Sequence, residues 1–372
     1  MSSPASTSRT PRTRSACAQK GARSRAPSPR GRGRGASKRL PSRPHRAGAA
    51  ASGSSSSAST GLHSCTTESS ACGLRRISSQ TRSFSDVRSG FVAVAGRPNV
   101  GKSTLVNSIC GGKVAIVSDK PQTTRRRITG VANGDGYQLV LVDLPGFQRP
   151  RDPLTEHMQR TVDASLEDVD GVVLALAGDE KIGAGDRFVA RRVFGAGAPV
   201  VIVLNKVDRM TPADIAAQIE AASWLGEFHA LHPVSAKTGE GVEALRAELA
   251  GLLPAGPAYF PRGELTDLSV EVRIAELVRE QALALTRDEV PHAVTVEVEE
   301  IADERVTAVL YVETESQKGI LVGKAGRMIK AIGSQARPEI ELVLGREVFL
   351  ELRVKVRPKW RRDEAMLERL GI

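Results

Sequence analysis

The chain contains 372 residues, with 53 Lys+Arg against 42 Asp+Glu and a formal net charge of +11. This length allows two ordinary domains, each able to bury its own core. No stretch approaches the roughly 18 consecutive apolar residues that a membrane-spanning helix requires. Three of the four cysteines lie before residue 73 and only Cys110 lies further along, which excludes a disulfide scaffold and a zinc site built of cysteines.

The basic excess belongs to the first part of the chain. Residues 1–67 hold 13 basic residues and no acidic one, whereas residues 68–372 hold 40 basic and 42 acidic residues. Residues 1–88 consist mainly of Ser, Arg, Ala, Gly and Pro, and such a segment cannot bury enough apolar surface to offset its ordering entropy. We therefore predict a disordered leader over residues 1–88. Two interpretations stay open, a chloroplast or mitochondrial transit peptide and a start codon assigned too far upstream.

Residues 89–253 alternate short apolar runs with longer segments of helical spacing. The runs are each short enough for a buried strand, and they cover residues 91–95, 138–142, 172–177, 200–204 and 231–234. The helical segments cover residues 103–110, 154–165, 185–194, 213–225 and 242–253. This alternation predicts an α/β domain in which a mostly parallel sheet carries helices on both faces.

A proline-rich linker over residues 254–266 separates this domain from a second one at 267–372. The second domain begins with a predicted helix at 268–287 and two alternating strands at 292–301 and 305–314. Two helices around a glycine turn follow at 317–344, and a last strand at 347–356. The order α-β-β-α-α-β predicts an α+β unit with a three-stranded sheet.

The segment from Gly96 to Thr104 predicts a triphosphate site. Gly-Arg-Pro-Asn-Val-Gly-Lys-Ser fits the G-x-x-x-x-G-K-[ST] pattern, and it follows a predicted strand and opens a predicted helix. Glycines allow backbone amides to approach phosphate closely, while the lysine reaches the β- and γ-phosphates and the serine hydroxyl binds magnesium. The predicted contacts are Gly96, Asn99, Val100, Gly101, Lys102, Ser103 and Thr104.

Three further elements follow at the ends of later predicted strands. In Asp143-Leu-Pro-Gly146 the carboxylate would hold magnesium and the Gly146 amide would sense the γ-phosphate. The second element is Asn205-Lys206-Val-Asp208. Its aspartate can accept hydrogen bonds from N1–H and the exocyclic amino group of guanine, which favours GTP over ATP. The third is Ser235-Ala236-Lys237, which can offer a backbone amide to guanine O6. Because all these loops lie at one edge of an open parallel sheet, we expect them to share one ligand.

The loop from Lys120 to Arg127 is the predicted γ-phosphate sensor. Its residues Gln122, Thr123 and Thr124 include a hydroxyl that would complete the magnesium shell, and the spacing does not choose between the two threonines. The arginine run 125–127 fits a solvent-exposed face as well as it fits a functional role in this loop. Phe147 occupies the place where small signalling GTPases carry a glutamine that orients water, so hydrolysis needs other help. We assign catalysis to Lys102, Asn99 and Gly146. Asn99 resembles the asparagine of potassium-activated GTPases, which makes K⁺ a hypothetical second cation.

The second domain carries Gly323-Lys324-Ala325-Gly326 between two helical segments, the arrangement of a type II KH domain. Residues 316–362 hold 12 basic and four acidic residues, a local excess of +8 that favours binding of phosphate backbones. We predict RNA contacts at Gly323, Lys324, Ala325, Gly326, Arg327 and Lys330. Trp360 fits base stacking and internal packing equally well.

These motifs together resemble the Era family of ribosome-associated GTPases over about residues 89–372. The C-terminal KH domain with Gly-Lys-Ala-Gly distinguishes that family from other GTPases with similar loops. The resemblance implies a Mg²⁺-dependent GTPase that binds GTP and GDP, the 3′ region of small-subunit ribosomal RNA and 30S-type particles, and that acts in small-subunit maturation. It also implies that GTP favours the RNA-competent arrangement, a monomeric state and, in some members, peripheral contact with the inner membrane face.

The resemblance also bears on the leader and on rival functions. Bacterial members begin shortly before the first strand, which makes Val87 a natural start and favours a cytoplasmic bacterial protein over an organellar one. A second function class is an RNA-binding scaffold that GTP stabilises and that hydrolyses little. A third class is a signalling or RNA-modifying GTPase. The absence of a cysteine or other catalytic cluster in residues 264–372 argues against modification chemistry.

Overall fold

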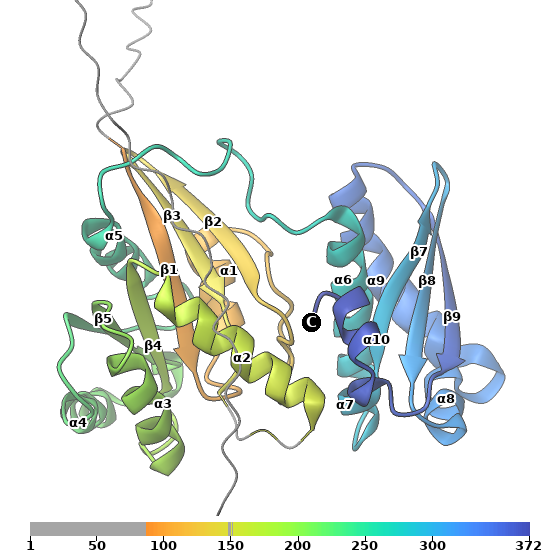
Figure 1. Ribbon diagram of the computed structural model, residues 1–372, viewed down its shortest axis with the longest axis horizontal. Coiled ribbons are helices and arrows are strands. Elements are labelled where there is room, and N and C mark those ends of the chain that lie inside the picture. Colours follow the sequence, from red (N-terminus) through yellow and green to blue (C-terminus); the bar gives the residue numbers. More distant parts are fainter. Residues whose placement is uncertain (1–86, 148–149, 151) are drawn as a thin grey trace, which may run out of the picture. The chain divides into compact units, whose positions relative to one another are not determined.

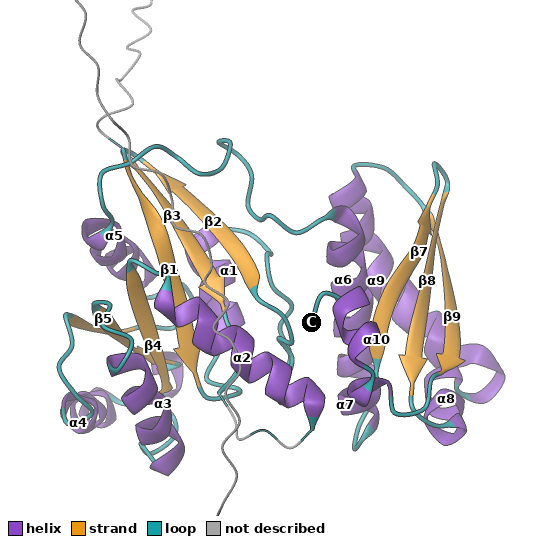
Figure 2. Cartoon of the chain, in the orientation of Figure 1, coloured by secondary structure: helices purple, strands orange, loops and turns teal. Residues whose placement is uncertain are grey.

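The computed structural model describes residues 87–147, 150 and 152–372. The predicted leader over residues 1–88 therefore lies, apart from Val87 and Arg88, outside the described residues. The strands of the described part form two sheets, and each sheet belongs to one of the predicted domains (Figures 1 and 2).

The first described sheet contains six strands in the order β2-β3-β1-β4-β5-β6. They are β1 (Arg88–Gly96), β2 (Ile128–Gly134), β3 (Tyr137–Asp143), β4 (Gly171–Ala177), β5 (Val200–Asn205) and β6 (Ala230–Pro233). All neighbours pair in parallel except β2 and β3, which are antiparallel. This arrangement confirms the mostly parallel sheet.

Strand β2 is absent from the sequence prediction. Its residues Ile-Thr-Gly-Val-Ala-Asn-Gly contain no continuous apolar run, because it is an edge strand with Thr129 and Gly130 in its first half. The turn Asp135-Gly136 joins it to β3, with Gly136 at φ +80°. Asp-Gly between two strands is a strong hairpin signal, so the sequence did carry the information for this strand.

Helices cover both faces of this sheet. On one face α1 (Lys102–Cys110) and α5 (Val242–Leu252) pack through Leu105 and Leu245 onto Val92 and Leu141. On the other face lie α2 (Pro153–Glu167), α3 (Ala184–Phe194) and α4 (Pro212–Ser223). Since both faces are buried, the central strands consist almost entirely of apolar residues, which explains why the runs were readable in the sequence.

The second described sheet has three strands in the order β7-β8-β9, with β7 and β8 antiparallel and β8 and β9 parallel. Its elements are α6 (Val270–Leu285), α7 (Val290–Ala293), β7 (Thr295–Ile301), β8 (Arg305–Val312), α8 (Glu315–Val322), α9 (Arg327–Leu344), β9 (Phe349–Val356) and α10 (Glu364–Arg369). The predicted order is confirmed. The strand expected from His292 starts at Thr295 instead, because Pro291 stands in the first turn of the short helix α7.

The chain after β9 folds back onto the second sheet. Trp360 is fully buried and packs with Val309, Tyr311 and Leu367, and its indole Nε1 donates to the carbonyl of Ala293 at 2.7 Å. Of the two interpretations of Trp360, the packing one therefore holds here. Among the described helices none is long and apolar enough to cross a membrane.

Candidate active site and nucleic-acid interface

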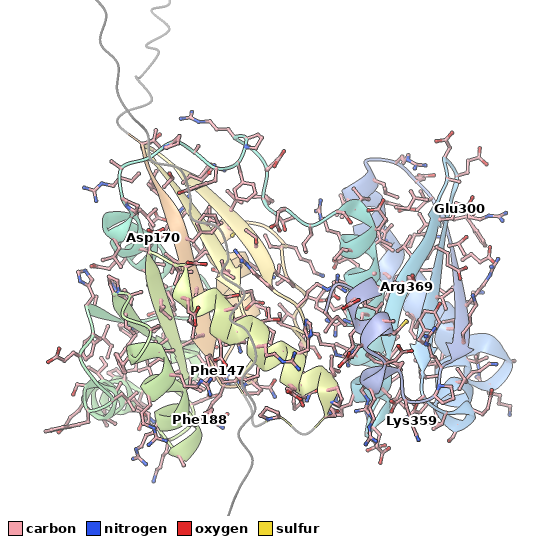
Figure 3. The ribbon with its side chains drawn as sticks, viewed as in Figure 1. Phe147, Asp170, Phe188, Glu300, Lys359 and Arg369 are labelled. Carbon is pink, nitrogen blue, oxygen red and sulfur yellow. The ribbon has the colours of Figure 1, made fainter. Side chains whose placement is uncertain are left out.

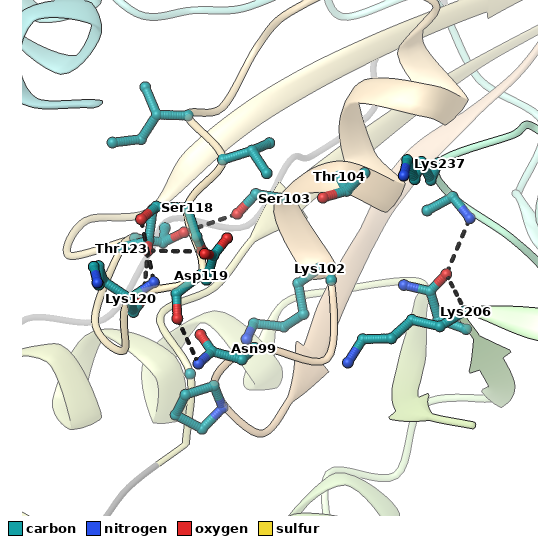
Figure 4. Close-up of a pocket in the computed structure, with 18 of the residues that line it drawn as sticks. Asn99, Lys102, Ser103, Thr104, Ser118, Asp119, Lys120, Thr123, Lys206 and Lys237 are labelled. Carbon is teal, nitrogen blue, oxygen red and sulfur yellow. Dashed lines mark hydrogen bonds between the residues drawn. The ribbon is translucent and has the colours of Figure 1, made fainter. Parts of the chain in front are cut away.

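The loops that follow the strands of the first sheet surround one pocket of about 710 Å³. It is lined by residues from each of the nucleotide elements predicted from the sequence, among them Thr124, Gly146 and Asp208. Figure 4 shows Lys102 and Lys237 at this pocket. An open parallel sheet gathers loop tips in this way because the carboxyl ends of its strands meet at one edge. The sequence-predicted groups are thus brought together.

The loop between β1 and α1 has the backbone of a phosphate cradle. Asn99 and Gly101 adopt positive φ angles of 64° and 92°. A Cβ at Gly101 would lie 2.3 Å from the side-chain amide nitrogen of Asn205, so the position admits only glycine. Helix α1 starts at Lys102 without a side-chain cap, which leaves its first amides available to an anion.

Lys102 is buried and its ammonium donates to the carbonyl of Arg97 at 3.0 Å. Burial lowers the pKa of Lys102 to about 8, and the nearby Asp143 carboxylate offsets only part of this effect. A buried ammonium with so little compensation is unfavourable unless an anion joins it. The pocket is therefore electrostatically prepared for phosphate.

Three oxygen groups beside Lys102 form the arrangement expected for magnesium. The Ser103 hydroxyl donates to Asp143 Oδ2 at 2.7 Å, and the Thr124 hydroxyl donates to the same oxygen at 3.1 Å. The other carboxylate oxygen, Asp143 Oδ1, is buried and has no hydrogen-bond partner among the described residues. Burial raises the pKa of Asp143, with Lys102 and the two hydroxyls opposing that shift. One carboxylate and two hydroxyls suit a hard cation that takes its remaining ligands from phosphate and water.

The two candidate threonines differ in position. Thr124 is buried, and its hydroxyl lies 2.9 Å from that of Ser103. The Thr123 hydroxyl instead donates to the carbonyl of Lys120 at 2.6 Å, within its own loop (Figure 4). Gln122 lines the pocket with a φ of 62°. The geometry therefore separates two hydroxyls that sequence spacing leaves equivalent.

Gly146 lies against the phosphate loop. A Cβ there would approach the backbone nitrogen of Pro98 to 2.9 Å, and the next amide, that of Phe147, donates to the carbonyl of Gly96 at 3.2 Å. The Phe147 ring is buried in the core on one face of the sheet (Figure 3). It presents no polar group to orient water, in agreement with the sequence prediction.

Asn99 connects the phosphate loop to the sensor loop. Its side-chain amide donates to the carbonyl of Asp119 at 2.9 Å (Figure 4). Both residues line the pocket, and Asn99 is exposed to it. Its amide oxygen and the Asp119 carbonyl are ligands of the type that monovalent cations accept.

The base side of the pocket is tied together by Asn205. Its amide nitrogen donates to the carbonyl of Val100 at 2.8 Å, and its amide oxygen accepts from the backbone N–H of Lys206 and Ala236 at 2.8 and 3.0 Å. The Ala236 amide thus has a partner within the protein. This connecting role of Asn205 was missed at the sequence level, since it depends on three loops meeting.

Asp208 and Lys206 complete this side. One oxygen of Asp208 accepts from the Ser235 hydroxyl at 2.7 Å, which orients the carboxylate. Lys206 adopts a φ of 69° and its ammonium lies 3.0 Å from a carboxylate oxygen of Asp179. Lys237 is exposed at the pocket wall. An oriented carboxylate at this place suits the two adjacent donors of guanine.

The glycine turn of the second domain links α8 to α9. Gly323, Ala325 and Gly326 have positive φ angles of 70°, 53° and 73°. Lys324, Arg327 and Lys330 are exposed around them, and none forms an ion pair within the described part of the chain. A turn with exposed amides and unpaired cations is suited to a phosphodiester backbone.

The local charge around this turn is smaller than the sequence count suggests. Six of the 12 basic residues in 316–362 are paired with carboxylates outside that segment or within it, namely Lys318 with Glu315, Arg337 with Glu341, Arg353 with Glu351, Lys355 with Glu299, Arg357 with Asp363 and Arg361 with Glu313. The excess of +8 is therefore partly neutralised by carboxylates outside the segment, of which Glu299 and Glu313 are distant in sequence from their partners. The cations at the glycine turn, Lys324, Arg327 and Lys330, are among those without a carboxylate partner in the described part of the chain.

Comparisons with known proteins agree with both sites. A family model described as a 50S ribosome-binding GTPase matches residues 91–206, and one described as a KH domain matches residues 289–361. The chain is 45% identical over 299 residues to the GTPase Era of Mycobacterium sp. (strain JLS) and to that of Mycobacterium tuberculosis (strain ATCC 25177 / H37Ra), covering 77% of this chain and 100% of each relative.

Two solved structures match most of the described chain. One is a variant of Aquifex aeolicus Era bound to GDP·AlF4⁻, with a TM-score of 0.74. The other is Era in complex with MgGDPNP and nucleotides 1506–1542 of 16S ribosomal RNA, with a TM-score of 0.75. Both are 36% identical in sequence, and the alignment covers 77% of this chain and 99% of theirs.

Proposed function

This chain belongs to the Era family of GTPases, and on that premise we propose that it couples GTP hydrolysis to binding of the 3′ region of small-subunit ribosomal RNA during maturation of the small subunit. The observation that carries the proposal is the combination, in one chain, of a complete guanine-nucleotide pocket and a cationic glycine turn of KH type. A family relative binds a GTP analogue and such RNA together.

Magnesium is assigned to Ser103, Asp143 and Thr124. The buried, unpartnered oxygen of Asp143 supports this assignment, because a bound cation would satisfy it. The cation would neutralise charge on the β- and γ-phosphates. Thr124 is preferred over Thr123 as the sensor of the γ-phosphate because its hydroxyl lies beside Ser103.

Hydrolysis is assigned to Lys102, Gly146 and Asn99. Lys102 stabilises charge on the transferred phosphoryl group, and the Gly146 amide binds a γ-phosphate oxygen. Because Phe147 stands in place of a polar side chain, we propose that additional positive charge near the phosphates assists hydrolysis. Asn99 and the Asp119 carbonyl are the groups that would hold K⁺ there.

RNA binding is assigned to Gly323, Lys324, Ala325, Gly326, Arg327 and Lys330. The turn brings backbone amides to the phosphates of a single strand, and the exposed cations add affinity that depends on salt. We place the protein in the bacterial cytoplasm, on the ground that the relatives are bacterial. The monomeric state is proposed from the family resemblance alone. Peripheral membrane contact remains part of the family hypothesis.

Retention on small-subunit particles tests the proposal. Particles are incubated with the protein and either a non-hydrolysable GTP analogue or GDP, and bound protein is crosslinked and mapped on the RNA. We expect retention with the analogue, release with GDP, and crosslinks near the 3′ end of the small-subunit RNA. Retention that is equal with both nucleotides would favour the GTP-stabilised scaffold, and crosslinks confined to other RNA would contradict the assigned target.

A further inference from the structure

The arginine run that precedes β2 is not absorbed by the proposed function. Arg125 is buried and Arg126 is nearly so, whereas Arg127 is exposed, so the run is not the solvated face that the sequence allowed. The run directly follows Thr124. What holds the two buried arginines therefore also acts on the residue that contacts Ser103 and Asp143.

Arg125 is bound by the backbone of the second domain. Its guanidinium donates to the carbonyls of Val294, His292 and Pro291 at 2.7, 3.0 and 3.2 Å, and it lies over the ring of Trp360 at 5.6 Å from the centroid. These carbonyls belong to the end of α7 and the residue after it, where a helix leaves acceptors without partners. An arginine is suited to this place because its planar group has several fixed donors.

The residue on the other side of Thr124 is held as well. Arg279, on α6, donates from Nη2 to the carbonyl of Thr123 and to Glu276. Glu276 in turn lies 3.7 Å from Arg126. Burial alone would raise the pKa of Glu276, but Arg279 and Arg126 together hold it below its usual value. The carboxylate is thus ionised and keeps both arginines in place.

The segment that leads into the same loop has a third attachment. Glu280, one turn along α6 from Glu276, accepts the backbone N–H of Val117 at 2.9 Å. The neighbouring Ile116 is buried in the core of the second domain with Val278. Residues of the KH domain therefore hold the sensor loop at Thr123 and Arg125, and hold the segment that leads into it at Ile116–Val117.

A purely structural interface does not need this chemistry. Buried ion pairs are on average no more stabilising than apolar side chains of the same size, since their desolvation offsets their attraction. Buried ion pairs instead add a defined geometry, because each hydrogen-bond donor fixes the position of one acceptor. Here the Thr123 carbonyl before Thr124 is a fixed acceptor, and the Arg125 guanidinium after Thr124 is a fixed donor.

We propose that Arg279 and Glu276, together with Arg125, are positioning residues for GTP hydrolysis: the RNA-binding domain sets the place of the Thr124 hydroxyl at the magnesium site. This inference rests on the proposed role of Thr124 and deepens it. It gives the KH domain a part in completing the nucleotide site, in addition to its contact with RNA.

The test replaces the ion pair by apolar side chains of similar size, in the double variant Glu276→Leu/Arg279→Met. Steady-state hydrolysis is measured against GTP and against Mg²⁺, and GDP affinity and thermal unfolding are measured in parallel. We expect kcat to fall about tenfold and the half-saturating Mg²⁺ concentration for hydrolysis to rise about tenfold, as loss of one charge-assisted hydrogen bond predicts. Affinity for GDP should stay within about twofold, because GDP has no γ-phosphate for Thr124 to sense.

Three further variants make the result specific. Arg279→Lys keeps the charge and one donor direction, so it should recover most of the activity and serves as the test if the double variant does not fold. Arg361→Met removes a cation that contacts Asp152 at 3.8 Å and Glu313 but no residue of the sensor loop, and it should hydrolyse GTP like the original protein. Thr124→Ala should reproduce the double variant, and combining them should cost less than about twofold more.

The outcomes separate the two ideas. A folded double variant with unchanged kcat and Mg²⁺ requirement, beside an impaired Thr124→Ala, overturns the positioning role and leaves the proposed function intact. An unimpaired Thr124→Ala overturns the assignment of Thr124, and the positioning role with it. Equal losses of GTP and GDP affinity in the double variant would also overturn the inference, since they indicate general damage.

Discussion

The nucleotide pocket and the glycine turn of the KH domain bind phosphate by different physical means. Lys102, Asp143 and Asn205 are all at least nine-tenths buried, and each forms a hydrogen bond to the phosphate loop or to the first turn of α1, at Arg97, Ser103 and Val100 respectively. Lys324 and Lys330 are exposed and have no carboxylate partner among the described residues. The pocket is built for one small ligand, and the turn is built for a flexible polyanion.

Because of this difference, substitutions at the two sites should reduce ligand binding by different amounts. In a buried site, a lost partner leaves a desolvated polar group unsatisfied, which costs more than the hydrogen bond itself. At an exposed turn, water replaces a lost contact and the loss is smaller. Substitutions in the pocket should therefore have large and specific effects, and substitutions at the turn should have moderate effects that depend on salt.

The largest effect is expected from Asp208→Asn. The amide cannot accept from both N1–H and the amino group of guanine, so we expect GTP affinity to fall by about 10²- to 10⁴-fold. Xanthosine triphosphate, which carries a carbonyl in place of the amino group, should gain affinity because the new amide can donate to it. Isothermal titration calorimetry with both nucleotides measures the change. Unaltered preference for GTP would show that Asp208 does not read the base.

A smaller effect is expected from Asp143→Asn, which should lower hydrolysis without lowering thermal stability. Burial raises the pKa of this carboxyl, so without ligand its charge is unfavourable and the neutral variant should unfold at the same or a higher temperature. Hydrolysis should fall by about 100-fold, because the magnesium site loses its carboxylate. Thermal unfolding with and without Mg²⁺ and GTP measures both changes. A variant that is less stable when free but still hydrolyses GTP would contradict this description of the site.

The smallest effect is expected at the glycine turn. Gly326 has a φ of 73° and open space around the site of a Cβ, whereas a Cβ at Gly323 would lie 2.7 Å from that of Met328. Gly326→Asp is therefore the cleaner variant, with Gly326→Ala as the control for backbone strain alone. We expect RNA affinity to be about tenfold lower for the aspartate variant than for the alanine variant, with GTP affinity unchanged.

The dependence of RNA affinity on salt concentration is a second test of binding at the glycine turn. With Lys324, Arg327 and Lys330 contacting phosphates, the logarithm of RNA affinity should fall with the logarithm of salt concentration at a slope of about −2. Fluorescence anisotropy with a short single-stranded RNA gives this slope. Equal RNA affinity of the Gly326→Asp and Gly326→Ala variants, or a slope near zero, would contradict binding at the turn.

Much of the fold was readable because the central strands are buried on both faces. Strands β1, β3, β4 and β5 show as apolar runs, and the loops that follow them carry distinctive glycines, lysines and aspartates. The edge strand β2 was missed because its buried half contains Thr129 and Gly130, so it shows no continuous apolar run although these residues are buried. Helix α10 was not predicted, and Trp360 stayed open between stacking and packing, because the signal for both is packing against a distant sheet.

The sequence by itself predicted the chemistry that we propose for this protein: which loops bind phosphate, which carboxylate reads the base, and where a glycine turn contacts nucleic acid. These properties follow from residue type and from the local backbone that the residue type permits. Only the tertiary structure decided between Thr123 and Thr124 as neighbours of Ser103, buried Arg125 against the second domain, and paired Lys355 and Arg361 with distant carboxylates. Each of those outcomes depends on contacts between residues far apart in sequence, and no local pattern contains them.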